Sequence, residues 1–310
     1  MLNISIESFD ETKHLFAIYY PLILVIAGTF FNSFTLILLC QSTFKNTTTR
    51  PTIYYMRTIA IFDILMLYGW NLDHYLFGFH QFSLQRYSIF LCKIFSFLNY
   101  FTSQVSAWLR VFICLDRYLS LSRPHQTWIT RPQNVLRIII CIILVFILIN
   151  GHFFLFACYK NFNGTINPQS MFYQIYPYWD YVNLALYNCL PFILMVIFNS
   201  GVLYHLIHLH QNVTLSHLRI QHRAITITLV ITTCLFLIMT IPATIFYAFF
   251  YKTTSEPVLY LFDSLLYTYH TLSFLIYLIT FAEFRRLVIR LLKPQLWSRI
   301  QPTAFPLPLI

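Results

Sequence analysis

The sequence is poor in charged residues and in glycine. Only 10% of its 310 residues are charged, while 58% are hydrophobic; in a soluble domain about a quarter of the residues are charged. Six glycines and the lack of polar low-complexity tracts leave no flexible linker to a separate soluble domain. These shortages exclude an ordinary soluble enzyme or binding domain, and they indicate a single integral membrane bundle.

Seven apolar runs are long enough to cross a bilayer, because about 20 apolar residues in a helix span its hydrocarbon core. The gaps between the runs are short and polar or contain proline, as loops between packed helices do. We therefore expect an all-α membrane protein with an extracellular N-terminus (1–14), a seven-transmembrane domain (15–282) and a cytoplasmic tail (283–310). The runs cover 15–40, 53–77, 90–118, 135–156, 179–205, 222–250 and 258–282.

The basic residues around these runs predict the orientation, since lysine and arginine accumulate on the cytoplasmic side. Fourteen of them follow odd-numbered runs, on one side of the membrane, and five lie on the other side. The N-terminus is therefore expected outside the cell, with the chain crossing the plasma membrane. Because the net charge of +10 is spread between the runs and does not line one face, no nucleic-acid partner is expected. Sequons at Asn3 and Asn163 fall outside and are the predicted glycosylation sites.

The third run begins at Cys92 and ends in Asp116-Arg117-Tyr118. About 24 helical steps of roughly 1.5 Å separate Cys92 from Asp116, so the two residues lie on opposite sides of a bilayer. A guanidinium held by its neighbour Asp116 can be released toward the backbone carbonyls of a partner. The alternative is that Arg117 is an ordinary cytoplasmic anchor at a helix end.

This arrangement resembles the third helix of the rhodopsin-like (class A) G-protein-coupled receptors. Other matches are Gly28 and Asn32 in the first run, Ala60 to Asp63 in the second, Pro191 in the fifth, Phe236 and Pro242 in the sixth, and Tyr277 followed by Phe284-Arg285 in the seventh. The departures are Thr240 where tryptophan is usual, Asn199 where tyrosine is usual, His222 in place of an acid, and Ser273-Phe274 in place of Asn-Pro. These departures concern the activation mechanism more than the fold.

The resemblance implies a seven-helix bundle with a short amphipathic eighth helix from about Glu283 to Leu292, lying on the inner membrane face. It also implies that the cytoplasmic half exchanges between two packings, one of which admits a heterotrimeric G protein. No catalytic step, cofactor or metal is required. The residues expected to carry coupling are Asp116, Arg117, Tyr118, Phe236, Pro242 and Tyr277.

Asp63 is a functional candidate because a carboxylate in mid-membrane is costly to bury. The alternative is a structural role, in which the Asp63 carboxylate is neutralised by a partner. Arg110 lies at a depth where it could be that partner. In the family the matching aspartate takes part in a cluster of water and a sodium ion. Asn32, Ser106 and Ser273 are the other expected members of this polar cluster. We hypothesise that the Arg110 guanidinium replaces the sodium ion.

The resemblance also implies a disulfide between Cys92 and the second outer loop. Cys158 is the expected partner, because the other five cysteines fall within the runs or toward the cytoplasm. Cys158 lies closer to the fourth run than the second-loop cysteine of the family usually does, so we expect the fourth helix to end near Asn150 or Gly151. Residues 152–158 would then begin the loop, and Asn163-Gly164 would suit the tight turn of a hairpin.

The ligand pocket of this family opens outward between the third, fifth, sixth and seventh helices. Asn99 stands where monoamine receptors carry an aspartate, which disfavours an amine. Tyr267 stands where visual pigments carry a Schiff-base lysine, which excludes retinal. Asp263, together with Asp73 and Asp180, could meet an arginine or a terminal amine of a peptide, although such acidic residues are also ordinary solvated loop charge. The expected pocket residues are Asn99, Tyr247, Asp263 and Tyr267.

The general appearance is closest to invertebrate neuropeptide receptors of the RFamide type. A chemosensory receptor for a small molecule remains an alternative. A seven-span transporter is a weaker alternative, because it would need several charged residues facing one another within the membrane, and Asp63 and Arg110 are the only clear ones. His205 and His208 would share a helical face and could suggest a metal site. Histidines whose polar tips lie among the lipid headgroups are the simpler interpretation. The expected partners are thus a heterotrimeric G protein, an extracellular peptide and membrane lipid.

Overall fold

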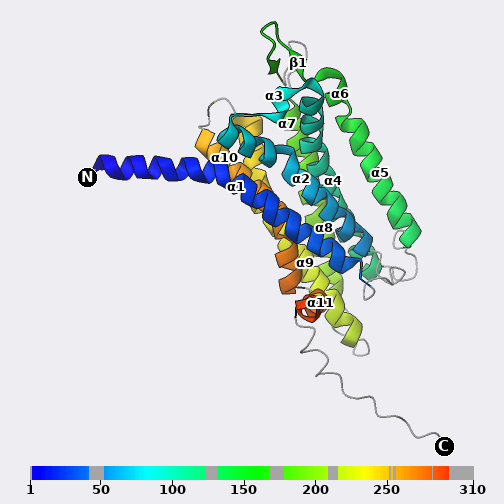
Figure 1. Cartoon of the computed structure of the whole chain (residues 1–310). Helices are drawn as coiled ribbons and strands as arrows, with labels where there is room; N and C mark the ends of the chain where they lie inside the picture. Colours follow the sequence, from blue (N-terminus) through cyan, green and yellow to red (C-terminus); the bar gives the residue numbers. More distant parts are fainter. Residues whose placement is uncertain are drawn as a thin grey trace, which may run out of the picture.

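The fold is described from a computed structural model of the chain. It describes residues 2–41, 52–122, 131–167, 178–208, 216–250, 253, 256–280 and 282–292. Within these residues, seven long helical segments form one bundle (Figure 1). The expected all-α seven-helix architecture is confirmed.

The bundle is made of helices that follow the predicted runs closely. They are α1 (Leu2–Leu39), α2 (Thr52–His80), α4 (Ile89–Ser122), α5 (Pro132–Asn150) with α6 (His152–Phe156), α7 (Tyr178–Asn183) with the π-helical η2 (Leu184–Cys189) and α8 (Leu190–His208), α9 (Ser216–Ile245) with the π-helical η4 (Phe246–Phe250), and α10 (Glu256–Thr280). The smaller elements are α3 (Leu84–Tyr87), β1 (Tyr159–Lys160), β2 (Ile166–Asn167) and α11 (Ala282–Leu292).

Two helices begin earlier than the apolar runs suggest. α1 is helical from Leu2, and its first part projects away from the bundle (Figure 1). α9 begins at Ser216 and not near residue 222. A helix can continue past the end of an apolar run because its backbone hydrogen bonds are satisfied within the helix, whatever the side chains are.

Four segments among the described residues are long and apolar enough to cross a membrane by length and composition alone. These are Ile18–Leu39, Pro132–Phe156, Tyr178–Ile207 and Ile227–Phe250. α2, α4 and α10 are 29, 34 and 25 residues long and pack among these segments. Large apolar side chains such as Leu148, Ile207 and Ile279 point outward, as in a surface that faces lipid.

α4 is the central helix of the bundle and packs against α2, α5 and α8. Its side chains from Phe101 to Ala107 are all buried, so it is enclosed around its circumference there, as a core helix is. α5 lies at one side of the bundle (Figure 1). The centre of α4 therefore brings polar side chains into contact with several helices at once.

The region after the fourth helix agrees in part with the expectation. α5 ends at Asn150, but residues 152–156 add a further helical turn, α6, where a loop was expected. The reason is apolar packing, because Phe153 is fully buried and stacks on Tyr100 with 5.1 Å between ring centroids. The hairpin is present: β1 and β2 pair antiparallel, and Gly164 has φ +78° at the turn, a conformation that glycine adopts without strain.

α11 follows α10 as the expected eighth helix, which was predicted at 283–292. Phe284, Leu287 and Val288 are buried against the bundle, whereas Arg285 and Arg290 are exposed. This two-faced pattern gives the helix one apolar side and one basic side. In Figure 1 it lies across the end of α10, at the end of the bundle opposite the β hairpin.

Candidate functional site

One cavity, at the end of the bundle that carries the hairpin, brings the four expected pocket residues together. Asn99, Tyr247, Asp263 and Tyr267 all line it, although they come from α4, η4 and α10. Trp70 of α2 and residues of α7 and η2 complete the wall. The phenol of Tyr267 donates a hydrogen bond to Oδ1 of Asn99 at 2.9 Å, and Trp70 stacks on the Tyr267 ring at 5.5 Å.

Two buried carboxylates face this cavity. Asp180 is 5% exposed and Asp263 is 4% exposed. Tyr100 donates to Oδ1 of Asp180 at 2.9 Å, and Tyr247 donates to Oδ2 of Asp263 at 2.6 Å. Within the described part of the chain, Oδ2 of Asp180 has no hydrogen-bond partner. Buried carboxylate oxygens are normally paired with donors or cations, so Oδ2 of Asp180 is an acceptor that the described side chains leave without a partner.

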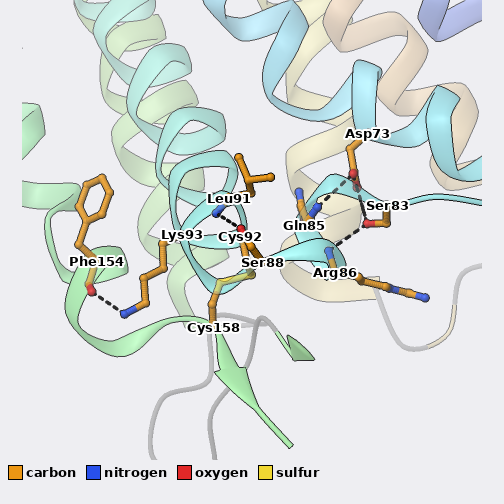
Figure 2. The surroundings of a disulfide bond; sticks show 10 residues. All are labelled: Asp73, Ser83, Gln85, Arg86, Ser88, Leu91, Cys92, Lys93, Phe154 and Cys158. Carbon is orange, nitrogen blue, oxygen red and sulfur yellow. Dashed lines mark hydrogen bonds between the residues drawn. A yellow bond between two sulfur atoms is a disulfide. The ribbon is translucent and has the colours of Figure 1, made fainter. Parts of the chain in front are cut away.

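Asp73, the third aspartate expected near the ligand, has a different place. Figure 2 shows its carboxylate turned toward the start of α3, where Ser83 Oγ and the backbone amides of Leu84 and Gln85 donate to it. It caps the α3 segment, as acidic side chains do at helix N-termini, and does not line the cavity that holds Asp180 and Asp263. Its negative charge is consequently already engaged by protein donors.

The structure also assembles the expected polar cluster around Asp63, which is fully buried. Nη2 of Arg110 forms an ion pair with Oδ2 of Asp63 at 2.7 Å, and Ser106 donates to Oδ1 at 2.6 Å. Ser273 donates to Oδ2 at 3.2 Å, and Arg110 also donates to Ser106. Four side chains from three helices thus satisfy one another in the interior, as a buried charge requires.

A histidine that the sequence analysis missed completes this cluster. Nδ1 of His270 lies 2.8 Å from Oδ1 of Asp63, and the side chain of His270 is fully buried. Asn32 does not bond to the carboxylate; its amide donates to the backbone oxygen of His270 at 3.0 Å. One signal could have identified the histidine: it stands three residues before Ser273 and therefore on the same face of a helix.

At the other end of α4, Arg117 is held by two neighbours. Its Nη2 forms an ion pair with Oδ2 of Asp116 at 2.7 Å, and it also donates to Oγ1 of Thr52. Thr52 donates to Oδ2 of Asp116 at 2.9 Å, and Asp116 is fully buried. Thr52, at the start of α2, was not foreseen as part of this arrangement.

The disulfide between Cys92 and Cys158 is confirmed. It ties the start of α4 to the segment just before the β hairpin, as Figure 2 shows. Beside it, Nζ of Lys93 donates to the backbone oxygen of Phe154 at 2.8 Å. The disulfide and Arg117 therefore mark opposite ends of one helix, with the cavity lined by Asn99 and Tyr267 at the disulfide end.

A sequence profile of the 7 transmembrane receptor (rhodopsin family) matches residues 13–279. This chain belongs to that family. It is a multi-pass membrane receptor and not an enzyme, since receptors of this family signal without a catalytic step. A search of curated proteins found no match.

The remaining expected switch residues of the receptor are packed in its interior. Phe236 of α9 is fully buried between the rings of Tyr187 and Tyr269, at centroid distances of 5.5 and 5.6 Å. Pro242 lies inside the helical part of α9. Tyr277 is buried and meets the Phe284 ring of α11 at 5.9 Å, so the seventh and eighth helices are joined by aromatic packing.

Tyr118 of the receptor packs against α8. Its ring lies 6.1 Å from that of Phe198 and 5.8 Å from that of His205. Gly201 leaves room for it, because a Cβ at that position would lie 2.6 Å from the Tyr118 ring.

Two of the positions where this receptor departs from the family pattern are occupied by neutral hydrogen-bonding groups. Thr240, which stands in place of a tryptophan, donates to Oδ1 of Asn188 at 2.7 Å. Asn199, which stands in place of a tyrosine, donates to Thr233 at 2.9 Å. His222 lies in the first part of α9, whose side chains the structure does not describe. The large aromatic ring next to Phe236 comes instead from Tyr187 of η2, which the sequence analysis did not single out.

Proposed function

We propose that this receptor binds an extracellular peptide through a basic group of the ligand and then activates a heterotrimeric G protein. The observation that carries the proposal is the pair of buried carboxylates, Asp180 and Asp263, that face one cavity. Tyrosine hydroxyls donate to each. Neither forms an ion pair with a basic residue in the described part of the chain, which supports a ligand group as the partner of these carboxyl groups.

An arginine side chain or a terminal amine of a peptide suits this cavity. A guanidinium presents several donors in a plane and can pair with carboxylate oxygens in two places. Binding would relieve the unpaired Oδ2 of Asp180, and a buried oxygen without a partner costs about 1–3 kcal/mol. Asn99 accepts from Tyr267 within the same wall and contributes no charge, which agrees with a peptide and not a monoamine.

The signalling half of the proposal concerns Arg117. In the arrangement described here, Asp116 and Thr52 hold its guanidinium. Release of this contact would free a permanent charge with several donors to meet backbone carbonyls of a G protein. We place this end in the cytoplasm and the disulfide end outside the plasma membrane, because disulfides persist in oxidising compartments and basic residues collect inside.

The test is nucleotide exchange on heterotrimeric G proteins by membranes that contain the receptor. A pool of amidated neuropeptides rich in arginine is compared with peptides of the same length without basic residues. We expect a response to basic peptides that Arg117→Ala abolishes while surface expression persists. Asp180→Asn and Asp263→Asn should each weaken the response by about tenfold or more, the effect of losing one charged hydrogen bond.

Asp73→Asn is the matched control, because it removes the same charge from a carboxylate that already caps α3. It should leave peptide potency nearly unchanged. Silence across the pool from a well-expressed receptor would contradict the peptide proposal. A response to small molecules that neither Asp180→Asn nor Asp263→Asn alters would favour a chemosensory receptor.

A further inference from the structure

We propose that Tyr187 and His270 connect the ligand cavity to the buried Asp63–Arg110 pair, so that Tyr187 acts as a positioning residue for signalling. The proposal rests on the ligand site proposed above, because it takes that cavity as the place where the ligand binds. Its physical basis is a chain of short contacts between the cavity wall and the ion pair.

Tyr187 is the first member of this chain. It belongs to η2 and lines the cavity, yet its side chain is only 1% exposed. Its hydroxyl oxygen lies 3.1 Å from Nε2 of His270. Tyr187 therefore borders the cavity from within the packed wall, while its hydroxyl reaches the interior.

His270 is the second member, and both of its ring nitrogens are engaged. Nδ1 lies 2.8 Å from Oδ1 of Asp63, opposite the Nε2 contact with Tyr187. Arg110 already balances the Asp63 charge, and a neutral imidazole meets both contacts if Nδ1 donates and Nε2 accepts from Tyr187. Asn32 holds the backbone oxygen of the same residue, so α1 helps to keep this part of α10 in place.

Aromatic contacts close the chain into a loop. The Arg110 guanidinium lies over the Tyr269 ring at 5.0 Å, and Phe236 touches both Tyr269 and Tyr187. The loop therefore contains Tyr187, His270, Asp63, Arg110, Tyr269 and Phe236. Tyr187 is the one of these six that lines the cavity. A ligand that moves this ring alters the support of the ion pair from two sides, through His270 and through Phe236.

The geometry of α4 carries such a change toward the Arg117 end. Arg110 and Arg117 are seven residues apart, which is about two helical turns, so they lie on the same side of α4. η2 is π-helical, and its neighbouring residues Tyr187 and Asn188 are both buried. π-helical turns within helices are frequent at functional sites. Loosening Arg110 from Asp63 is expected to loosen the last turns of α4.

Tyr187→Phe tests the proposal because it removes one hydroxyl and keeps the ring. The matched control is Tyr269→Phe, which makes the same change nearby at a hydroxyl that has no hydrogen-bond partner among the described residues. The measurement is hydrogen exchange of the backbone amides in Arg117–Ser122 of the purified full chain, with no peptide and no G protein. We expect Tyr187→Phe to speed this exchange by about fivefold, the effect of one net hydrogen bond, and Tyr269→Phe to leave it as in the wild type.

His270→Asn is the second variant and keeps the test decisive if Tyr187→Phe folds poorly. The shorter asparagine keeps a donor toward Asp63 but does not reach Tyr187, so it should speed exchange to the same extent. Adding Tyr187→Phe to it should change nothing more. Equal effects of Tyr187→Phe and Tyr269→Phe, or an effect confined to η2, would overturn the proposal. Because no ligand is used, failure of the peptide proposal would leave this result interpretable by itself.

Discussion

Arg110 carries a permanent charge into the interior of a membrane bundle, and its partners determine whether that charge is tolerated. The ion pair with Asp63 at 2.7 Å is supported by Ser106, Ser273 and His270. A buried pair adds little net stability compared with apolar side chains of similar volume, but removal of one partner leaves an uncompensated charge. The cluster is thus sensitive to single changes and tolerant of paired ones.

Arg110→Leu should therefore lower the free energy of unfolding by about 3–5 kcal/mol, because it leaves the buried Asp63 carboxylate without its cationic partner. The measurement is thermal unfolding of the purified receptor in detergent. In the double variant Asp63→Asn with Arg110→Leu, most of the loss should be recovered. A double variant as unstable as Arg110→Leu would show that packing around the guanidinium, and not its charge, is the dominant contribution.

The same pair predicts how the receptor responds to sodium. A guanidinium already fills the place beside the carboxylate, so replacing choline chloride by sodium chloride should not shift the melting temperature of the wild type. Arg110→Leu opens that place, and sodium should then stabilise the variant through binding linked to folding. A sodium-dependent shift in the wild type, or in its agonist affinity, would count against the hypothesis that Arg110 replaces the ion.

At the scale of elements, the contact between α4 and α8 depends on a glycine. Tyr118 fits against Gly201, where an added Cβ would lie 2.6 and 2.7 Å from ring atoms. Gly69 in α2 is different, because its Cβ would meet Asn99 no closer than 3.6 Å. The first position is closed to a methyl group by a rigid ring, and the second is open to one.

Gly201→Ala should accordingly lower the melting temperature, since overpacking costs about 1–3 kcal/mol and exceeds the helix-propensity gain of up to about 1 kcal/mol. Gly69→Ala should be neutral or slightly stabilising, because only the propensity gain remains. Thermal unfolding of both variants under one condition decides the matter. If both variants behave alike, the ring of Tyr118 yields easily and does not fix the spacing between α4 and α8.

At the scale of the whole molecule, the disulfide and the hairpin lie at one end of the bundle and α11 at the other (Figure 1). The proposed ligand cavity lies at the disulfide end, and the Asp116–Arg117 pair lies two dozen residues along α4, toward α11. The orientation expected from the basic residues, with the disulfide end outside the cell, stays a prediction. Asn163 in the hairpin is exposed and offers a test of it.

Asn163→Gln should remove a glycan from the receptor, because an exposed sequon in a loop outside the cell is open to glycosylation. The measurement is gel mobility before and after glycosidase treatment of receptor from animal cells, with Asn3→Gln in parallel. The side chain of Asn3 lies outside the described set, so that site stays a prediction from sequence. Glycans at Asn46 or Asn212, which lie outside the described residues, would instead contradict the proposed orientation.

Much of the architecture followed from residues read in order. The length of each apolar run is a local property, and a helix is the form in which a backbone satisfies itself in lipid, so the spans could be placed with no tertiary information. The eighth helix and the cavity residues Asn99 and Tyr267 were predicted from positions that the family shares, whereas Cys158 was chosen by elimination among the cysteines. Helix ends, such as the added turn of α6 or the early start of α9, were harder, because apolar packing and backbone bonding extend helices beyond the hydropathy signal.

The composition of the sites depended on contacts between distant parts of the chain. Asp73, Asp180 and Asp263 look alike as outer acidic residues, yet one caps α3 and the other two face the cavity. Tyr187 had no signal in the sequence, and His270 was marked only by its helical spacing from Ser273. Both matter because they meet across three helices at Asp63. The sequence gives the chemical type of each charged or polar side chain, but the packing of the helices determines its partner. In a low-dielectric interior the role of such a group depends on that partner.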